Sequence, residues 1–248
     1  MNGTFDALIE QLRHPDRNRR GQAALSLGAL GDVRAVDALV PALRTEADPF
    51  VRENITWALV RAGDAALRPL LDLLRDADPV VRHHAAHVLG KMRDPRASDA
   101  LIEALQDHDA TVLAKAAFAL GRIGDPRAIT ALVGLLGHES RELQSTLVTV
   151  LEGFGPPAVQ ALLDALQHER WQVRERAAYV LGAMASADAR PALMKTLEDR
   201  DWQVRFAALH ALGTLGGAGS VHAVQSMLSD GDRRVRSLAT EVMKRLSP

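Results

Sequence analysis

The chain has 248 residues, of which 47% are hydrophobic and only 4% aromatic, and its formal net charge is -1. This balanced charge excludes a global attraction to nucleic acid or to anionic membranes. The absence of cysteine excludes disulfides, thiolate zinc sites and cysteine nucleophiles. No apolar run reaches the length of a membrane span and the N-terminus shows no signal-peptide pattern, so we expect a cytoplasmic protein without membrane association.

A short motif recurs along the chain every 30–32 residues. Its clearest copy begins at Asp78, where an aspartate, a proline and the pair Val81-Arg82 open a helical pattern. Self-similarity at such a period predicts a stack of small repeated units. We number each unit from the first residue of the Val-Arg pair, position 0. Position 0 is occupied in the eight units by Arg19, Val51, Val81, Val112, Leu143, Val173, Val204 and Val235.

Each unit predicts two helices, because a single apolar stripe cannot be buried by one helix alone. The second helix should carry its stripe at positions 0, 4 and 8, as in Val81, Ala85 and Leu89. It should end at a glycine turn such as Gly31, Gly63 or Gly124. All units but the sixth, which has Arg170, offer an N-cap residue: Asp16, Asp48, Asp78, Asp109, Ser140, Asp201 and Asp232.

The motif Asp-x-x-Val-Arg-x-x-Ala-Ala-x-x-Leu-Gly, with the turn Gly124-Asp125-Pro126-Arg127-Ala128, resembles HEAT-like repeats of the phycobilisome-lyase type. The resemblance implies an all-α protein, a right-handed α-solenoid of about eight helix pairs. It also implies that the arginine at position 1 pairs with turn aspartates and that the second helices line a concave surface. We expect one domain, 1–248, with units at approximately 4–31, 32–63, 64–94, 95–125, 126–155, 156–186, 187–217 and 218–248.

Two departures interrupt the pattern in the middle of the chain. Leu113 and Gln144 replace the arginine at position 1. The fifth unit, Ser140 to Pro157, contains β-branched residues that are poor helix formers. It represents either sequence drift held in place by neighbouring units or a bend that shapes a binding site.

Position 6 of the second helix lies far from the core stripe, since each helical residue turns by 100°. Its occupants are Leu25, Trp57, His87, Phe118, Thr149, Tyr179, His210 and Glu241. Exposed rings rimmed by polar groups are typical of binding surfaces. The alternative is that the rings pack between adjacent helices, as we expect for Trp171 and Trp202 at the helix starts. The predicted partner-binding residues are Trp57, His87, Phe118, Tyr179, His210, Asn54, His84, Lys115, Arg176, Arg61, Lys91 and Arg122.

This row predicts a scaffold or adaptor that binds a protein or peptide of acidic character. No catalytic motif is present, and we expect no cofactor. His83 and His87, with Glu53 one unit earlier, are candidate metal ligands that partly resemble the His-Glu motifs of deoxyhypusine hydroxylase, but one partial match does not build a metal site. Two alternatives remain: a lyase-like accessory role, which the resemblance implies, and nucleic-acid binding, which the balanced charge disfavours.

Overall fold

The protein is all-α, as predicted. The computed structural model describes residues 2–246, and in this range it contains sixteen α-helices, six short 3-10 helices and no strand. Residue 1 and residues 247–248 of the predicted domain lie outside the described range. The chain forms two compact units, one ending at Ile123 and the other beginning at Gly124. The repeat boundaries given above remain predictions.

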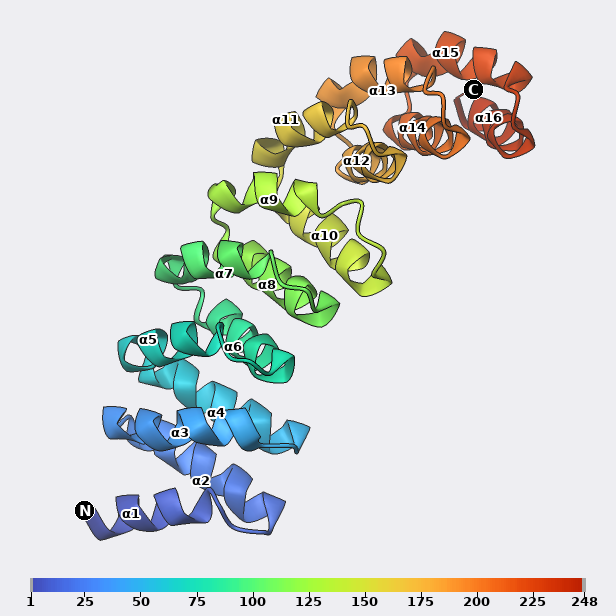
Figure 1. Cartoon of the computed structure of the whole chain (residues 1–248). Helices are drawn as coiled ribbons and strands as arrows, with labels where there is room; N and C mark the ends of the chain where they lie inside the picture. The colour runs from blue at the N-terminus through green and yellow to red at the C-terminus, as the bar shows by residue number, and fades with distance from the viewer. Residues whose placement is uncertain (1, 247–248) are drawn as a thin grey trace. The chain divides into compact units, whose positions relative to one another are not determined.

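The N-terminal unit is a stack of four helix pairs. Its second helices contact one another in series, α2 with α4, α4 with α6 and α6 with α8 (Figure 1). Short 3-10 helices, Val33–Ala35 and Pro95–Ala97, lead into two of the first helices. The eight α-helices are α1 (Asn2–Gln11), α2 (Arg17–Leu30), α3 (Val36–Thr45), α4 (Pro49–Ala62), α5 (Asp64–Leu73), α6 (Pro79–Met92), α7 (Ser98–Ala104) and α8 (Ala110–Ile123).

The C-terminal unit repeats this arrangement with four further pairs. Its second helices α10, α12, α14 and α16 again contact in series (Figure 1). Its 3-10 helices are Pro126–Ala128, Ala187–Ala189, Ala218–Ser220 and Met227–Ser229. The eight α-helices are α9 (Ile129–Gly134), α10 (Arg141–Phe154), α11 (Pro156–Ala165), α12 (Trp171–Ala183), α13 (Arg190–Thr196), α14 (Trp202–Leu215), α15 (Val221–Ser226) and α16 (Arg233–Leu246).

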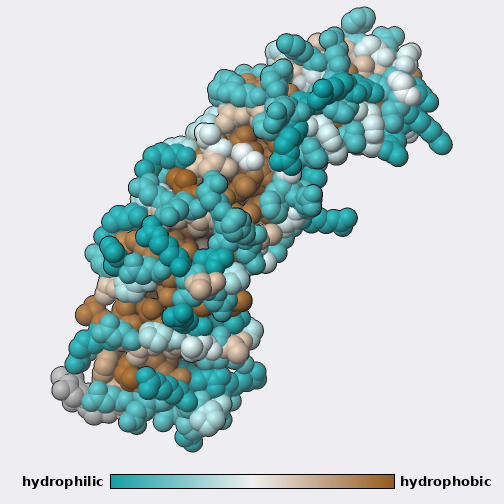
Figure 2. All heavy atoms as spheres, viewed as in Figure 1, coloured by the Kyte–Doolittle hydropathy of each residue, from teal (hydrophilic) through white to brown (hydrophobic). Residues whose placement is uncertain are grey.

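The core of each unit is the apolar stripe that the sequence predicts. From the second repeat onward, every residue at position 0 is at most 2% exposed, whereas Arg19 in the first repeat is exposed. Leucines at position 8, such as Leu89 and Leu181, are completely buried. Apolar side chains are visible between the helices of the N-terminal unit, among a larger polar area (Figure 2). Within residues 2–246, no helix is both long and apolar enough to cross a membrane.

Most of the predicted caps are formed. The carboxylate of Asp16 accepts hydrogen bonds from the backbone amides of Asn18 and Arg19, at 2.7 and 3.3 Å. The predicted cap at Asp201 is wrong, because the Asp201 carboxylate makes no hydrogen bond to the first backbone amides of α14. Its carboxylate instead binds the guanidinium of Arg174 at 2.7 Å. The β-branched residues of the fifth unit do not interrupt its second helix, since α10 runs unbroken for 14 residues.

Small residues let adjacent second helices approach closely. A Cβ added to Gly90 in α6 would lie 2.9 Å from the Cα of Ala119 in α8. One added to Gly182 in α12 would lie 2.7 Å from the Cα of Ala211 in α14. Both distances are shorter than a normal carbon–carbon contact. The glycines therefore set the spacing of the helices that carry the predicted surface.

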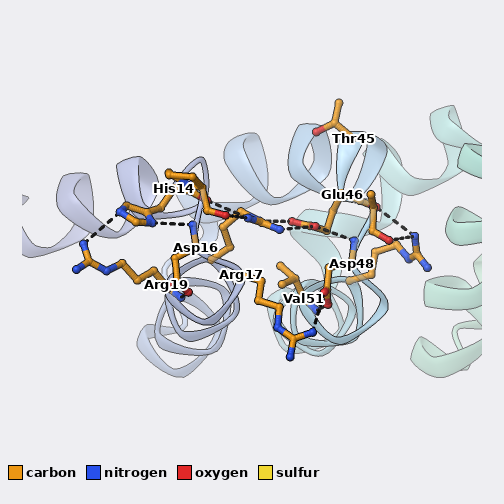
Figure 3. A network of polar contacts seen from close by, with 12 residues as sticks. His14, Asp16, Arg17, Arg19, Thr45, Glu46, Asp48 and Val51 are labelled. Carbon is orange, nitrogen blue, oxygen red and sulfur yellow. Dashed lines mark hydrogen bonds and ion pairs between the residues drawn. The ribbon is translucent and has the colours of Figure 1, made fainter.

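The arginine at position 1 joins one repeat to the turn of the next, as the resemblance implies. Arg82 donates to both carboxylate oxygens of Asp107 at 2.6 and 2.8 Å, and these bonds lower the pKa of that aspartate. Its Nη1 also donates to the carbonyl of Asp76. Figure 3 shows the first of these joints, around Glu46 and Asp48. Equivalent pairs are Arg20 with Glu46, Arg174 with Asp199, and Arg205 with Asp230.

Within residues 2–246, position 1 lacks a carboxylate partner in four repeats, those of Arg52, Leu113, Gln144 and Arg236. Arg52 hydrogen-bonds only the carbonyls of Glu46 and Ala47, at 3.1 and 3.3 Å. Gln144 donates from Nε2 to the carbonyl of His138 at 2.6 Å, which is the backbone contact that the arginines make. Because its other amide atom is an acceptor, Gln144 cannot bind a carboxylate through both.

Candidate functional site

The row at position 6 is on the surface of both units. The side chains of Trp57, Phe118 and Tyr179 are 40%, 44% and 46% exposed. Their rings are therefore not closed off between neighbouring helices, which was the alternative expectation. Thr149, His210 and Glu241 at the same position are also exposed, while Leu25 and His87 are half-buried.

Trp57 on α4 packs on one side against α2, the second helix of the preceding repeat. A Cβ added to Gly28 of α2 would lie 2.7 Å from the indole, so this ring packs directly over the glycine. The guanidinium of Arg61 lies 5.2 Å from the ring centroid, within the range of a cation–π interaction. Arg61 also donates from Nε to the Gly28 carbonyl at 2.9 Å. The indole is thus held in one place while its outer part faces solvent.

Glu53 neutralises part of the basic rim around this ring. It forms an ion pair with Lys91, and its other oxygen lies 3.4 Å from Nε2 of His87. Burial raises the pKa of Glu53, but Lys91 and His87 outweigh this effect, so the pKa falls below its usual value. Burial lowers the pKa of His87. Glu53 is therefore ionised at neutral pH, and Lys91 is not a free cation.

Phe118 on α8 is accompanied by two cations. The ammonium of Lys115 lies 5.8 Å from the centroid of its ring. Arg122, one turn further along the helix, is exposed, and within residues 2–246 it has no hydrogen bond or ion pair. Of the basic residues predicted for the N-terminal unit, Arg122 has the charge that is most available to a partner.

The predicted partner-binding residues Asn54 and His84, at position 3 of the second helix, are less exposed than expected. Asn54 is only 9% exposed, and its Nδ2 atom would lie 2.9 Å from a Cβ added to Gly21 of α2. His84 at the same position of α6 is half-buried, with a buried Nδ1 that has no hydrogen-bond partner. Position 3 lies about 60° from position 0 and about 60° from position 6, so the neighbouring helix can cover it. Asn54 is therefore a packing residue and not a partner contact.

The three metal candidates are not brought together. His87 faces Glu53, whereas Nδ1 of His83 lies 3.2 Å from the carbonyl of Thr111 on α8. No group of three or more His, Asp or Glu side chains that could hold a metal occurs in the described part of the chain. The histidines instead line a small hollow of about 220 Å³ beside Arg52 and Lys115.

The C-terminal unit has a larger hollow, which is lined by its second helices α10, α12 and α14 and has a volume of about 620 Å³. The rings of Tyr179 and His210 stack at 6.1 Å with an interplanar angle of 17° and form one wall. Arg176 lies at its edge and donates to Gln144 Oε1 at 2.6 Å. Sequence reasoning named Tyr179, His210 and Arg176 but missed Gln144, whose departure from the repeat pattern was the available signal.

Trp171 and Trp202 are half-buried at the starts of α12 and α14. Trp202 meets Phe206 edge-on at 6.4 Å, and the guanidinium of Arg234 in the following repeat lies 4.3 Å from its ring. This contact between repeats agrees with the structural role predicted for Trp202.

The comparisons with known proteins agree with this architecture. The HEAT repeats family model matches residues 5–75, 67–152, 134–196 and 159–244. The bilin biosynthesis protein PecE of Mastigocladus laminosus is 44% identical over 61 residues, which are 24% of this chain and 23% of PecE. The chain therefore matches only about a quarter of that relative's length.

Solved structures are similar over nearly the whole chain. Kap95p, in a complex with RanGDP, has a TM-score of 0.64 at 15% identity over 97% of this chain and 39% of its own, a likeness of fold. The complex of CpcE and CpcF of phycocyanin lyase from Nostoc sp. PCC7120 has a TM-score of 0.47 at 25% identity, over 98% of this chain and 94% of that chain.

Proposed function

The chain belongs to the HEAT-repeat proteins, and from this premise we propose that it is an adaptor that captures a protein or peptide on its second helices. The observation that carries the proposal is the exposure of three large rings, Trp57, Phe118 and Tyr179, at the same repeat position. A helix surface in water gains nothing from such rings, whereas a partner that covers them removes apolar area from water.

The exposed ring area is large enough to contribute measurably to binding. An aromatic side chain buries roughly 200 Å² when fully covered. With at least 40% of each side chain exposed, a partner can cover roughly 80 Å² per ring, worth about 2 kcal/mol at 25 cal/mol per Å². Loss of one ring should therefore weaken binding by more than tenfold.

The charges beside the rings favour an acidic partner. Arg122 in the N-terminal unit and Arg141 in the C-terminal unit are exposed and have no hydrogen bond or ion pair in the described range. Lys91 is already paired with Glu53, and Arg61 with a backbone carbonyl. The available positive charge is thus confined to a few positions beside the rings, which suits carboxylates of a folded partner or peptide.

The experiment compares capture of partners from a native lysate by three forms of the chain. The double variant Trp57→Ala, Phe118→Ala should lose the captured protein and keep its helicity, although its melting temperature falls because Trp57 also packs on Gly28. Phe50→Ala is the matched control, because Phe50 is 57% exposed on α4 but lies outside the row. Equal loss in Phe50→Ala, or capture by the folded double variant equal to that by the wild type, would refute the proposal.

A lyase-like accessory role is the second candidate, and the local likeness to PecE favours it. The corresponding experiment adds a free bilin to the purified chain and records its visible absorption spectrum. A saturable spectral shift that Tyr179→Ala removes would support this role. An unchanged spectrum at bilin concentrations well above that of the protein would reject it.

A further inference from the structure

The hollow in the C-terminal unit occurs where the repeat pattern is broken. Six other second helices have an arginine at position 1, and α10 has Gln144. Gln144 keeps the backbone contact to His138, and its Oε1 is left to accept a hydrogen bond from Arg176 at 2.6 Å. An arginine has no acceptor atom, so it could not hold a second guanidinium in this way. The substitution therefore fixes Arg176 at the edge of the hollow.

The aromatic wall of this hollow is open, in contrast to the rings of the N-terminal unit. There, Arg61 lies over Trp57 and Lys115 over Phe118. In the described structure no cation lies over Tyr179 or His210, which stack on each other. Val148 of α10 adds an aliphatic side chain to the lining. The hollow can therefore receive an apolar side chain against a flat surface.

The charge at the edge of the hollow is positive. Arg141 lines the hollow and has no hydrogen bond or ion pair in the described range. Arg176 has one carboxylate neighbour, Glu175, at 3.5 Å, a distance too long for a strong charge-assisted hydrogen bond. Two guanidinium groups thus face one carboxylate. A second carboxylate from a ligand would balance them.

We propose that this hollow binds a peptide segment in which a carboxylate side chain neighbours a bulky apolar one. The carboxylate binds Arg141 and Arg176, and the apolar side chain lies on the Tyr179–His210 stack. The volume of about 620 Å³ falls within the usual range of ligand sites. The inference rests on the proposed adaptor function and specifies the chemistry of the partner.

The test uses the full chain and two blocked dipeptides, acetyl-Phe-Asp-amide and its neutral isostere acetyl-Phe-Asn-amide. Binding is measured by ¹⁵N NMR titration at low salt. The aspartyl probe should bind roughly tenfold more tightly than the asparaginyl probe, since charge-assisted hydrogen bonds to arginine are lost in the latter. Arg141→Ala and Tyr179→Ala should each weaken the aspartyl probe by a similar factor.

The most specific variant is Gln144→Arg, which restores the repeat residue. It should fold normally because arginine occupies this position in six of the other seven repeats, yet it should weaken the aspartyl probe because Arg176 loses its acceptor. Arg122→Ala is the control, because it removes an exposed, unpaired arginine from the N-terminal unit and should leave binding unchanged. Unchanged urea midpoints in every variant exclude misfolding as the cause of any loss.

Several results would overturn the inference. One is equal binding of the two dipeptides, and another is unchanged binding of the aspartyl probe in both Gln144→Arg and Arg141→Ala. A third is a loss of binding in Arg122→Ala as large as that in Arg141→Ala. The last is displacement of the aspartyl probe by an equal concentration of inorganic phosphate. If the dipeptides fail to bind while removal of Trp57 and Phe118 still abolishes partner capture, only the inference fails. If capture also survives ring removal, the proposed function fails with it.

Discussion

The ladder of arginines predicts that one substitution has unequal costs in two repeats. The Arg174 side chain is 7% exposed and donates to both oxygens of Asp199 at 2.7 and 2.9 Å, and to Asp201 at 2.7 Å. Arg52 occupies the same position of its repeat but hydrogen-bonds only two backbone carbonyls. We expect Arg174→Ala to destabilise the protein much more than Arg52→Ala.

The size of the difference follows from what each substitution leaves behind. Without Arg174, the carboxylate of Asp199, 12% exposed, loses its guanidinium partner, whereas Asp201, 32% exposed, keeps an ion pair with Arg200 at 3.4 Å. Removing one partner of a buried ion pair costs about 3–5 kcal/mol, and the partial access of Asp201 to water places the cost near 3 kcal/mol. Loss of the hydrogen bonds of Arg52 to carbonyls costs about 1 kcal/mol. The expected gap is about 2 kcal/mol.

The measurement is urea denaturation followed by far-UV circular dichroism, with native-state hydrogen exchange on α12 and α13. Exchange is needed because repeats contact only their neighbours and can open separately. Urea is preferred to guanidinium chloride because salt screens ion pairs. Equal losses in Arg174→Ala and Arg52→Ala would refute the argument that the carboxylates, and not the shared backbone contacts, make the ladder stabilising.

Two further predictions concern helix spacing and acid stability. Gly182→Ala should destabilise by about 1–3 kcal/mol, because its Cβ would lie 2.7 Å from the Cα of Ala211. Gly153→Ala in α10 should stabilise the protein by about 0.5–1 kcal/mol, because the added Cβ would meet open space and alanine favours a helix. Thermal melts in which both substitutions change the melting temperature in the same direction would contradict this prediction. Burial, followed by the charge of Arg52, lowers the pKa of His84 from 6.5 to about 4. The unfolded chain therefore takes up this proton first, and stability should fall as the pH drops from about 6.5 to 4. The expected loss is on the order of 1–2 kcal/mol after allowance for solvent access. The urea midpoint of His84→Gln should depend less on pH than that of the wild type. Identical pH dependence in the two proteins would exclude His84 as the source of the loss of stability in acid.

The parts of the fold that depend on local periodicity could be predicted from the sequence. Burial at position 0, as for Val81, and exposure at position 6, as for Phe118, follow from the 100° turn per residue once the period is known. The pairing of Arg82 with Asp107 followed from the family resemblance, because it recurs with the repeat. The helix pairs and most of the surface row needed no further information.

The side chains that could not be predicted are those whose environment depends on a neighbouring helix. Asn54 lies midway between the core and the surface row, and only the proximity of α2 at Gly21 decides that it is buried. Asp201 has the sequence context of a cap, but Arg174 competes for its carboxylate. Gln144 could be recognised as a departure, whereas its contact with Arg176 required the packing of α10 on α12.

The interrupted ladder also has a mechanical consequence. At the intact joints, a guanidinium clamps one helix to the turn beyond it, but Arg52 in the N-terminal unit and Gln144 in the C-terminal unit lack that clamp. Under tension applied along the chain, each stack should begin to peel at these weaker seams. Rupture would then release several helices together instead of one pair at a time.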